Sequence, residues 1–358
     1  MIEWVKGICE LMLRISSLSY KVQKKIILNK ISFEVKTGEI ICLLGPSGCG
    51  KTSTLRLIAG LERPLSGGIS IADQEVTSDG IFIEPHKRKV GFLFQDFALF
   101  PHLTAKQNIE WALTKTSNNR QVEELFEQIN MVGHEHKYPH ELSGGEQQRI
   151  ALARSIASNP RILLLDEPFS SLDTNLRNEI RDYTTQLLNQ MGITAIIVTH
   201  DPDEAMLIAD RIILMNKGEI TQIGSAFELY HKPVDEFAAS FLGPINTFRG
   251  TFSNSLIKTV IGDIPYNEIC STKELNVVIR PDSLKVVPND STHEKEVEAI
   301  VESLKTAGGI EHIRCSLVKQ KMDKDHVFIS QPAENLLKVG DRGNILFNLD
   351  KVIVFRRD

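Results

Sequence analysis

Residues 45–52 read GPSGCGKT, and their types and spacing are suited to holding phosphate. They fit the pattern G-x-x-x-x-G-K-[ST], in which glycines let the backbone curl so that successive N–H groups point at phosphate oxygens. In this pattern Lys51 reaches the β- and γ-phosphates of a nucleotide, and the Thr52 hydroxyl holds Mg²⁺. The octet alone does not tell whether the nucleotide is a substrate, a fuel or a switch. The residues predicted to surround its phosphates are Gly45, Pro46, Ser47, Gly48, Cys49, Gly50, Lys51, Thr52 and Ser53.

Carboxylate, imidazole and amide side chains follow three apolar runs elsewhere in the chain. Asp166 and Glu167 follow the apolar run in RILLLDEP, His200 follows that in TAIIVTHD, and Gln95 follows VGFLF. Asp166 is predicted to face Mg²⁺ through water, and Glu167 to orient or deprotonate the water that attacks the γ-phosphate. His200 could donate a hydrogen bond to the γ-phosphate or to that water, and Gln95 could offer oxygen to Mg²⁺ and an N–H to water. Taken alone, the acidic pair also fits an acidic turn, and His200 a structural residue. The catalytic candidates are Lys51, Gln95, Glu167 and His200, and the Mg²⁺ candidates are Thr52, Gln95 and Asp166.

A second glycine pair lies in LSGGEQQR, residues 142–149. Ser143, Gly144, Gly145 and Glu146 stand at the start of a helical run, so free N–H groups and a helix dipole are aimed at an anion. One chain then has two helix ends that could bind phosphate. If two chains pair head to tail, a γ-phosphate could be clamped between one end of each.

The segments around these residues predict an α/β domain followed by an all-β domain. Residues 39–44 read as a buried strand and residues 52–59 as a helix ended by Gly60. The runs RILLLD and TAIIVTH suit strands buried on both faces of a parallel sheet, whereas residues from about 104 to 157 read mostly as helix. Beyond FLGPIN, residues 241–246, short β-like runs predict a small barrel or sandwich. The predicted domains are residues 13–242 and 243–358.

Composition bounds the class of protein. The 358 residues carry a net charge of −5, which indicates a soluble globular chain without the basic excess of a nucleic-acid binder, and no apolar run approaches the length of a membrane helix. The cysteines are odd in number and widely spaced, which favours reduced thiols in the cytoplasm. They are Cys9, Cys42, Cys49, Cys270 and Cys315. Cys49 is expected to be a small apolar filler, with a redox sensor as the alternative. Because the sequence from Met12 reads as a natural start, residues 1–11 are expected to be an extension.

The order GPSGCGKT, Gln95, LSGGE, ILLLDE, SSLD and His200 resembles the ATP-binding subunit of ABC transporters, over residues 13 to about 240. The resemblance implies a P-loop NTPase fold, with a RecA-like core, a small antiparallel β-subdomain and a helical subdomain at about 95–158. The tail resembles the TOBE-type (OB-like) β domain of many import systems, mainly through VVIRPDSLKV. Two roles are open for this C-terminal β domain, namely regulation by a cytoplasmic signal and extra dimer contacts.

The resemblance also implies how such a chain works. ATP and Mg²⁺ are its cofactors, and hydrolysis drives transport by an integral-membrane permease served by an external solute-binding protein. Two copies form a homodimer in which Ser143 and Gly145 of one contact ATP bound to residues 45–52 of the other, with SSLD, residues 170–173, along the interface. The place of action is the cytoplasmic face of the bacterial inner membrane. Segments such as KRKVGFLFQDFALFPHLTAKQNI look most like ferric-iron importers, while spermidine/putrescine, sulfate, molybdate and sugar importers share much of the pattern.

Finer expectations concern single residues and short segments. Family members often place an adenine-stacking ring where this chain has Val22, so Tyr20 is the candidate for adenine contact. Residues 96–104, DFALFPHLT, are expected to face the permease or to join the core. The histidine-rich HEHKYPHE is expected to be a solvated connector, EPHKRKV a surface turn, and the acids of HDPDEAM the first turn of a helix. The alternatives to a transport ATPase are a soluble ABC ATPase acting on DNA or ribosomes, and a small-molecule kinase.

Overall fold

The computed structural model describes residues 11–113, 119–170, 172–266, 273–289, 297–318, 326–334 and 336–357. The chain divides into two compact units, Met1–Leu229 and Tyr230–Asp358. Cys9, Cys270 and Ser171 of the SSLD segment lie outside the described residues, as do residues 1–10 of the expected extension. The domain boundary expected between residues 242 and 243 stays a prediction.

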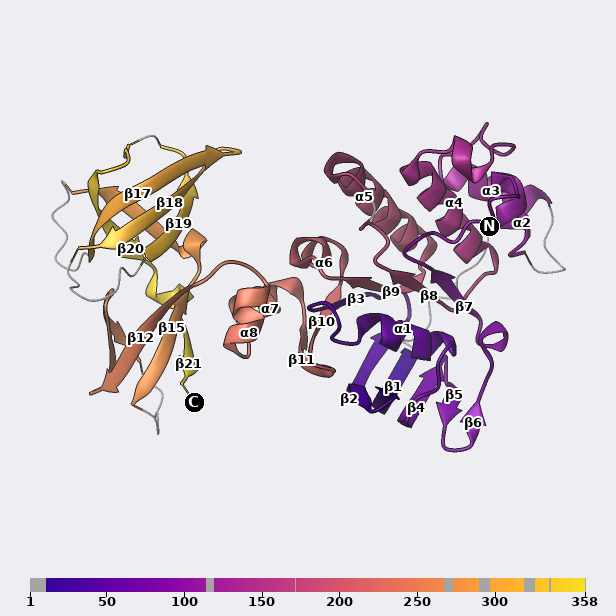
Figure 1. Ribbon diagram of the computed structural model, residues 1–358, viewed down its shortest axis with the longest axis horizontal. Coiled ribbons are helices and arrows are strands. Elements are labelled where there is room, and N and C mark those ends of the chain that lie inside the picture. The colour runs from indigo at the N-terminus through magenta and orange to yellow at the C-terminus, as the bar shows by residue number, and fades with distance from the viewer. Residues whose placement is uncertain are drawn as a thin grey trace. The chain divides into compact units, whose positions relative to one another are not determined.

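A six-stranded sheet forms the core of the first unit, in the order β11-β10-β3-β9-β8-β7 (Figure 1). Neighbouring strands run parallel from β10 to β7, and β11 is antiparallel. Every residue of β3, β8 and β9 is buried, as their unbroken apolar runs predict. The bounds are β3 (Ile40–Leu44), β7 (Val90–Leu93), β8 (Ile162–Asp166), β9 (Thr194–Thr199), β10 (Arg211–Asn216) and β11 (Glu219–Gly224).

An antiparallel sheet packs on this core through helix α1 (Lys51–Ala59). Residues of both sheets and of α1 share one apolar cluster, in which Leu43 of β3 and Leu55 of α1 are fully buried. Helix α1 ends at Gly60 in the left-handed conformation, as predicted. The strands are β1 (Leu11–Val22), β2 (Lys25–Lys36), β4 (Ser66–Ile71), β5 (Gln74–Ser78) and β6 (Ile81–Phe82).

Arg88 corrects one expectation. The run EPHKRKV was expected to be a surface turn, and residues 84–87 and Lys89 are exposed, but Arg88 after the short 3-10 helix Pro85–Lys87 is only 2% exposed. All its guanidinium nitrogens donate hydrogen bonds, because the C-terminal carbonyls of α1 and those of neighbouring strands surround it. Burial lowers the pKa of Arg88 to about 10, so it stays charged at neutral pH. The acceptors are the carbonyls of Leu57, Ile58, Val76 and Ile83 and the Thr77 hydroxyl, at 2.7 to 3.3 Å.

Four α-helices and strand β8 occupy what the structure describes between β7 and β9. Val122, Leu125, Phe126 and Ile129, which recur at helical spacing in the sequence, are all buried. Leu176, Ile180, Tyr183 and Leu187, also at helical spacing, belong to the longest described helix, α5 (Thr174–Met191), which ends at Gly192 in the left-handed conformation. The other bounds are α2 (Ala105–Glu110), α3 (Asn119–Gln128) and α4 (Gly144–Ala157), and α6 (Pro202–Ile208) follows β9. No helix in the described part of the chain is both long and apolar enough to span a membrane.

The second unit is mostly β-structure, as the tail predicts. Its two five-stranded sheets have the orders β14-β13-β12-β15-β21 and β16-β20-β17-β18-β19, and their apolar side chains form one core. Short helices α7 (Ala226–His231) and α8 (Glu236–Phe241) precede them. The strands are β12 (Asn246–Ser253), β13 (Leu256–Thr259), β14 (Gly262–Pro265), β15 (Glu274–Ile279), β16 (Leu284–Pro288), β17 (Val297–Ala307), β18 (Ile310–Leu317), β19 (His326–Pro332), β20 (Arg342–Phe347) and β21 (Ile353–Arg356).

Candidate nucleotide-binding and hydrolysis site

The carboxyl edge of the parallel sheet collects the candidate residues that lie far apart in the sequence. Gly45 follows β3, Gln95 follows β7, Asp166 ends β8 with Glu167 next, and His200 follows β9. The strand pairs β3–β9, β9–β8 and β8–β7 are all parallel and in register, so their carboxyl ends lie along one edge. Open α/β sheets bind ligands at this edge. Gln95 is exposed there.

The glycines of the octet hold backbone that other residues rarely adopt. Gly45, Gly48 and Gly50 have φ angles of +153°, +79° and +105°. A Cβ on Gly45 would lie 2.2 Å from the Met215 carbonyl oxygen, and one on Gly50 would lie 2.4 Å from the Leu28 side chain. The loop therefore needs glycine at its first and last turns for close packing as well as for conformation.

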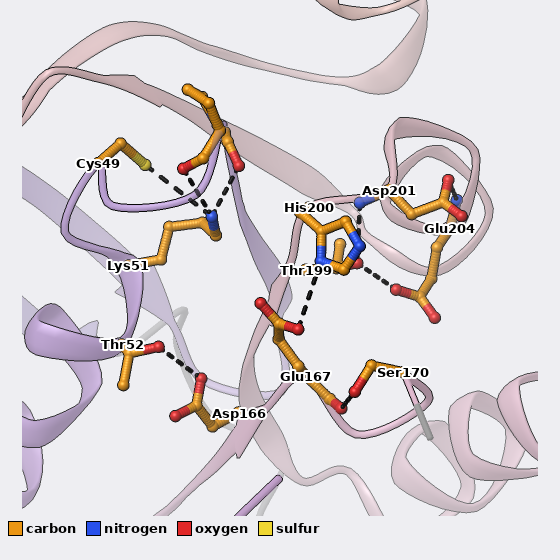
Figure 2. Close-up of polar contacts among 12 residues, drawn as sticks. Cys49, Lys51, Thr52, Asp166, Glu167, Ser170, Thr199, His200, Asp201 and Glu204 are labelled. Carbon is orange, nitrogen blue, oxygen red and sulfur yellow. Dashed lines mark hydrogen bonds and ion pairs between the residues drawn. The ribbon is translucent and has the colours of Figure 1, made fainter. Parts of the chain in front are cut away.

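Lys51 lies beneath this loop. Its Nζ donates hydrogen bonds to the carbonyls of Gly45, at 2.6 Å, and Pro46, at 3.1 Å (Figure 2). Only 5% of Lys51 is exposed, so the ammonium is held by the curve of the loop at the start of α1. The neighbouring Cys49 is 3% exposed, and burial raises the pKa of its thiol. A buried, uncharged thiol fits the apolar-filler interpretation better than a redox sensor.

Thr52 and Asp166 bring hard oxygen donors together. The Thr52 Oγ1 donates a hydrogen bond of 2.9 Å to Asp166 Oδ1 (Figure 2). Burial raises the pKa of Asp166, because it disfavours the charged carboxylate. A cation beside Asp166 would oppose this effect and favour the charged form. Mg²⁺ is commonly bound by one or two protein oxygens together with substrate phosphates. These residues therefore fit Mg²⁺, although the described residues contain no group of three or more His, Cys, Asp or Glu arranged to hold a metal by themselves.

Glu167 and His200 form a pair at the same edge. The His200 Nδ1 lies 3.3 Å from Glu167 Oε2 (Figure 2). Glu167 has a φ of +44°, unusual for a residue with a side chain. Its N–H donates to the Val198 carbonyl at 3.0 Å, and its carbonyl accepts from Ser170 Oγ at 2.9 Å. The carboxylate is thus held beside an imidazole that is more than half exposed, with a side-chain exposure of 54%.

Ser143 and Glu146 build the N-terminus of α4. Glu146 N–H donates to Ser143 Oγ at 3.4 Å, and Ser143 N–H donates to Glu146 Oε2 at 2.7 Å, which is a capping box. The S-x-x-E spacing could have predicted these bonds from the sequence. His134 of the histidine-rich connector also contacts Glu146, with Nε2 at 3.7 Å from Oε1. No hydrogen bond or ion pair among the described residues joins this segment to residues 45–52 of the same chain.

Glu146 gives a prediction about acid stability. The Ser143 N–H bond lowers the pKa of Glu146 in the folded chain. A lowered pKa means that this stabilisation is complete above the ordinary carboxyl value, about 4.3, and is lost as pH falls through the folded-state value. Glu146→Gln keeps an oxygen for the cap but cannot titrate. We expect the variant to be less stable at neutral pH, by less than about 1 kcal/mol after solvent screening, and to match the wild type in acid.

Urea unfolding followed by far-UV circular dichroism from about pH 7 to pH 3 measures this difference. Glu123→Gln, on the exposed face of α3, is the control and should change neither curve. An unchanged pH dependence in Glu146→Gln would contradict the prediction.

Tyr20, the candidate for adenine contact, lies in β1 and pairs with Leu28 of β2. A hydrogen bond to Glu62 raises the pKa of its phenol. Val22, at the position where the family often has an aromatic ring, is 47% exposed. Contact between Tyr20 and adenine stays a prediction.

Comparisons with known proteins agree with this geometry. The family model "ABC transporter" matches residues 28–170. A sulfate/thiosulfate import ATP-binding protein of Chromobacterium violaceum is 39% identical over 298 residues, which cover 80% of this chain and 79% of the relative. An Fe(3+) ions import ATP-binding protein of Pectobacterium atrosepticum is 35% identical, with 83% and 87% covered. A spermidine/putrescine import ATP-binding protein of Spiroplasma citri is 38% identical, with 77% and 81% covered.

A solved structure adds the fold. A dimeric ATP-binding cassette in a post-hydrolysis state, bound to ADP and Pi, superposes with a TM-score of 0.52 at 30% identity, covering 60% of this chain and 99% of that one. These relatives are at least 35% identical to this chain, and each alignment covers more than three quarters of it. The chain therefore belongs to the ATP-binding subunits of ABC import systems.

Proposed function

We propose that this chain hydrolyses ATP at the carboxyl edge of its parallel sheet, and that the free energy drives solute import. One observation carries the proposal: the Glu167–His200 pair, 3.3 Å apart, lies on the same edge as the Thr52–Asp166 pair and the loop that holds Lys51. A general base, a hydrogen-bond donor, oxygen ligands and a phosphate cradle are the parts that phosphoryl transfer to water requires.

The proposed roles follow from these positions. Lys51 exchanges its carbonyl partners for the β- and γ-phosphate oxygens of ATP, and the free N–H groups of the loop hold the same phosphates. Thr52, Asp166 and Gln95 are the residues that would hold Mg²⁺, which when bound neutralises charge on the phosphate oxygens. Glu167 orients or deprotonates the attacking water. His200 donates a hydrogen bond to the γ-phosphate, which fixes its position relative to Glu167.

The proposed assembly is a homodimer. The solved cassette described above is dimeric, and in this chain α4 begins at Gly144 after the capping residue Ser143, whose own N–H is bonded to Glu146. In a head-to-tail pair the N–H groups of Gly144 and Gly145 and the Ser143 hydroxyl would close over ATP bound to residues 45–52 of the other copy. Asp173, which caps α5, belongs to the segment that would lie along the interface.

The proposed partner is an integral-membrane permease at the cytoplasmic face of the inner membrane, served by an external solute-binding protein. Of the expected contact residues, Phe97 is buried in the core, whereas the rings of Phe100 and Trp111 pack edge to face at 4.8 Å. Trp111 is 68% exposed, and sequence reasoning did not single it out. We include Trp111 in the surface that receives the permease.

Ferric iron is the solute that the motif pattern favours. Sulfate is the second candidate, because the relative that is 39% identical over 298 residues is named for sulfate and thiosulfate. The relatives named for iron and for spermidine are similar to this chain to nearly the same degree, at 35% and 38%. Identity in this subunit therefore does not separate the solutes.

Reconstitution tests the proposal. The chain is co-purified with its permease and binding protein, placed in proteoliposomes, and assayed for ATP hydrolysis with ferric iron, sulfate, spermidine or no solute. We expect one solute to stimulate hydrolysis several-fold, and we expect it to be ferric iron. Stimulation by sulfate alone would replace ferric iron with sulfate as the proposed solute and keep the ATPase role. No stimulation by any importer solute would argue against coupling to import.

A further inference from the structure

His200 is flanked on both sides by a hydrogen-bonded chain that the proposed function does not use. Thr199, the last residue of β9, donates its hydroxyl hydrogen to Glu204 Oε2. The same Thr199 oxygen accepts the N–H of Asp201 at 3.1 Å. Figure 2 shows Glu204 and Glu167 on different sides of Thr199 and His200. The residue before His200 and the residue after it are thus tied to one hydroxyl.

The first turn of α6 fixes the other end of this chain. Asp201 caps the helix, and its Oδ1 accepts the N–H groups of Asp203, at 2.9 Å, and Glu204, at 3.3 Å. The backbone of His200 therefore cannot swing at the turn from β9 into α6 without breaking one of these bonds. These bonds hold in place the backbone from which the imidazole projects.

Burying the Glu204 carboxylate costs more free energy than burying an apolar side chain at the same position would. It is 7% exposed, and its helix neighbours on the buried face are the apolar Ala205 and Ile208. Burial raises the pKa of Glu204, while Arg177 and Arg181 lower it and Asp201 raises it. A buried carboxylate costs several kcal/mol unless it is hydrogen-bonded, whereas an apolar residue at this site would pack without that cost. Its hydrogen bond from Thr199 links this costly carboxylate to the residue that precedes His200.

We propose that Glu204 is a positioning residue for His200: through the Thr199 hydroxyl it holds the end of β9 so that the imidazole faces Glu167. The inference rests on the proposed role of His200 in ATP hydrolysis. Glu204 does not touch the reacting atoms. It acts by keeping the His200 Nδ1 near the Glu167 carboxylate, a distance of 3.3 Å in this structure.

Four single substitutions in the full chain test the inference. Thr199→Val removes the hydroxyl and keeps the shape, Thr199→Ser keeps the hydroxyl, and Glu204→Leu removes the acceptor while Glu204→Gln keeps an oxygen. Misplacing a reacting group by about 1 Å costs up to about 100-fold in rate. We expect Thr199→Val and Glu204→Leu each to lower kcat for ATP hydrolysis by about 10- to 100-fold with KM for ATP within about twofold. The serine and glutamine variants should retain most of kcat.

Two further measurements separate positioning from simple structural damage. Because both changes break one chain of bonds, the double variant Thr199→Val/Glu204→Leu should be no slower than the worse single variant. Thr184→Val is the matched control, because Thr184 is 1% exposed and the structure gives its hydroxyl no hydrogen-bond partner. We expect its kcat to equal that of the wild type.

His200→Ala, assayed in parallel, separates a failure of the proposed function from a failure of the positioning role. If His200→Ala hydrolyses ATP at the wild-type rate, the proposed role of His200 fails and the inference fails with it. If His200→Ala is inactive but Thr199→Val and Glu204→Leu keep wild-type kcat, the proposed function stands and the positioning role of Glu204 is overturned. Additive losses in the double variant, or no recovery of kcat in Thr199→Ser and Glu204→Gln, would also overturn it.

Discussion

Glu167→Gln is expected to lower kcat for ATP hydrolysis by about 10²- to 10⁴-fold, because a carboxamide cannot accept the proton of the attacking water. The change keeps the size of the side chain and leaves the backbone bonds to Val198 and Ser170 in place. Lys51 and Thr52 are unaffected, so the affinity for ATP should be close to that of the wild type. Phosphate release gives kcat, and a fluorescent ATP analogue gives the affinity.

The same variant tests the dimer. With hydrolysis blocked, ATP should hold two copies together, and light scattering should report the mass of a dimer with ATP and of a monomer without it. Glu75→Gln, an exposed change in β5, is the control and should hydrolyse ATP normally. Persistent monomers of Glu167→Gln in saturating ATP would contradict the head-to-tail pairing. Wild-type turnover by that variant would mean that another group activates the water.

Arg88→Met is expected to destabilise the first unit by at least about 3 kcal/mol, because several buried carbonyls lose their donor at once and each unmade bond costs about 1–3 kcal/mol. The methionine fills much of the space but donates nothing. The stability of Arg88→Lys should lie between those of the wild type and Arg88→Met, since an ammonium has three donors and cannot reproduce the fork of a guanidinium. Hydrogen exchange of peptides from β1, β2 and α1 measures the loss, because exchange reports the free energy of opening in each region.

Arg63→Met is the matched control for this prediction. Arg63 lies over the same Phe82 ring as Arg88, at 4.2 Å against 4.9 Å, but on the exposed side. Its loss should cost no more than about 1 kcal/mol. Peptides from β17 and β18 in the second unit should exchange at the wild-type rate in every variant. Equal effects of the Arg88 and Arg63 changes would show that the buried hydrogen bonds contribute little.

The sequence predicted the parts of this fold whose signals are local. The phosphate loop has a fixed spacing, α1 stops at Gly60, and the buried strands are unbroken apolar runs, so each could be found from a few neighbouring residues. The meeting of Asp166, Glu167 and His200 could also be predicted, because parallel strands place their carboxyl ends on one edge. The helix at Asp201 was predicted from its acids, and α6 begins there.

Contacts set by tertiary packing were beyond such reasoning. Arg88 stands in a run of charged residues that is typical of a surface turn, and only the arrangement of α1 against the strands shows that it is buried. Glu204 was interpreted as an acid suited to a helix dipole, and nothing local indicated that its carboxylate turns inward to Thr199. For the solute, the chain offers only a motif pattern that favours ferric iron and is largely shared with importers of other solutes, because in the proposed assembly the residues that contact the solute belong to other subunits.

The left-handed backbone of Glu167 sets activity against stability at one position. Residues with side chains reach a φ near +44° at a cost of about 1–3 kcal/mol, whereas asparagine adopts this region more readily. An engineer who selects this chain for heat resistance alone would therefore be drawn to Glu167→Asn, and each such success would remove the proposed base. Sequence libraries screened for stability should be screened for ATP turnover as well, because at residue 167 the two selections favour opposite outcomes.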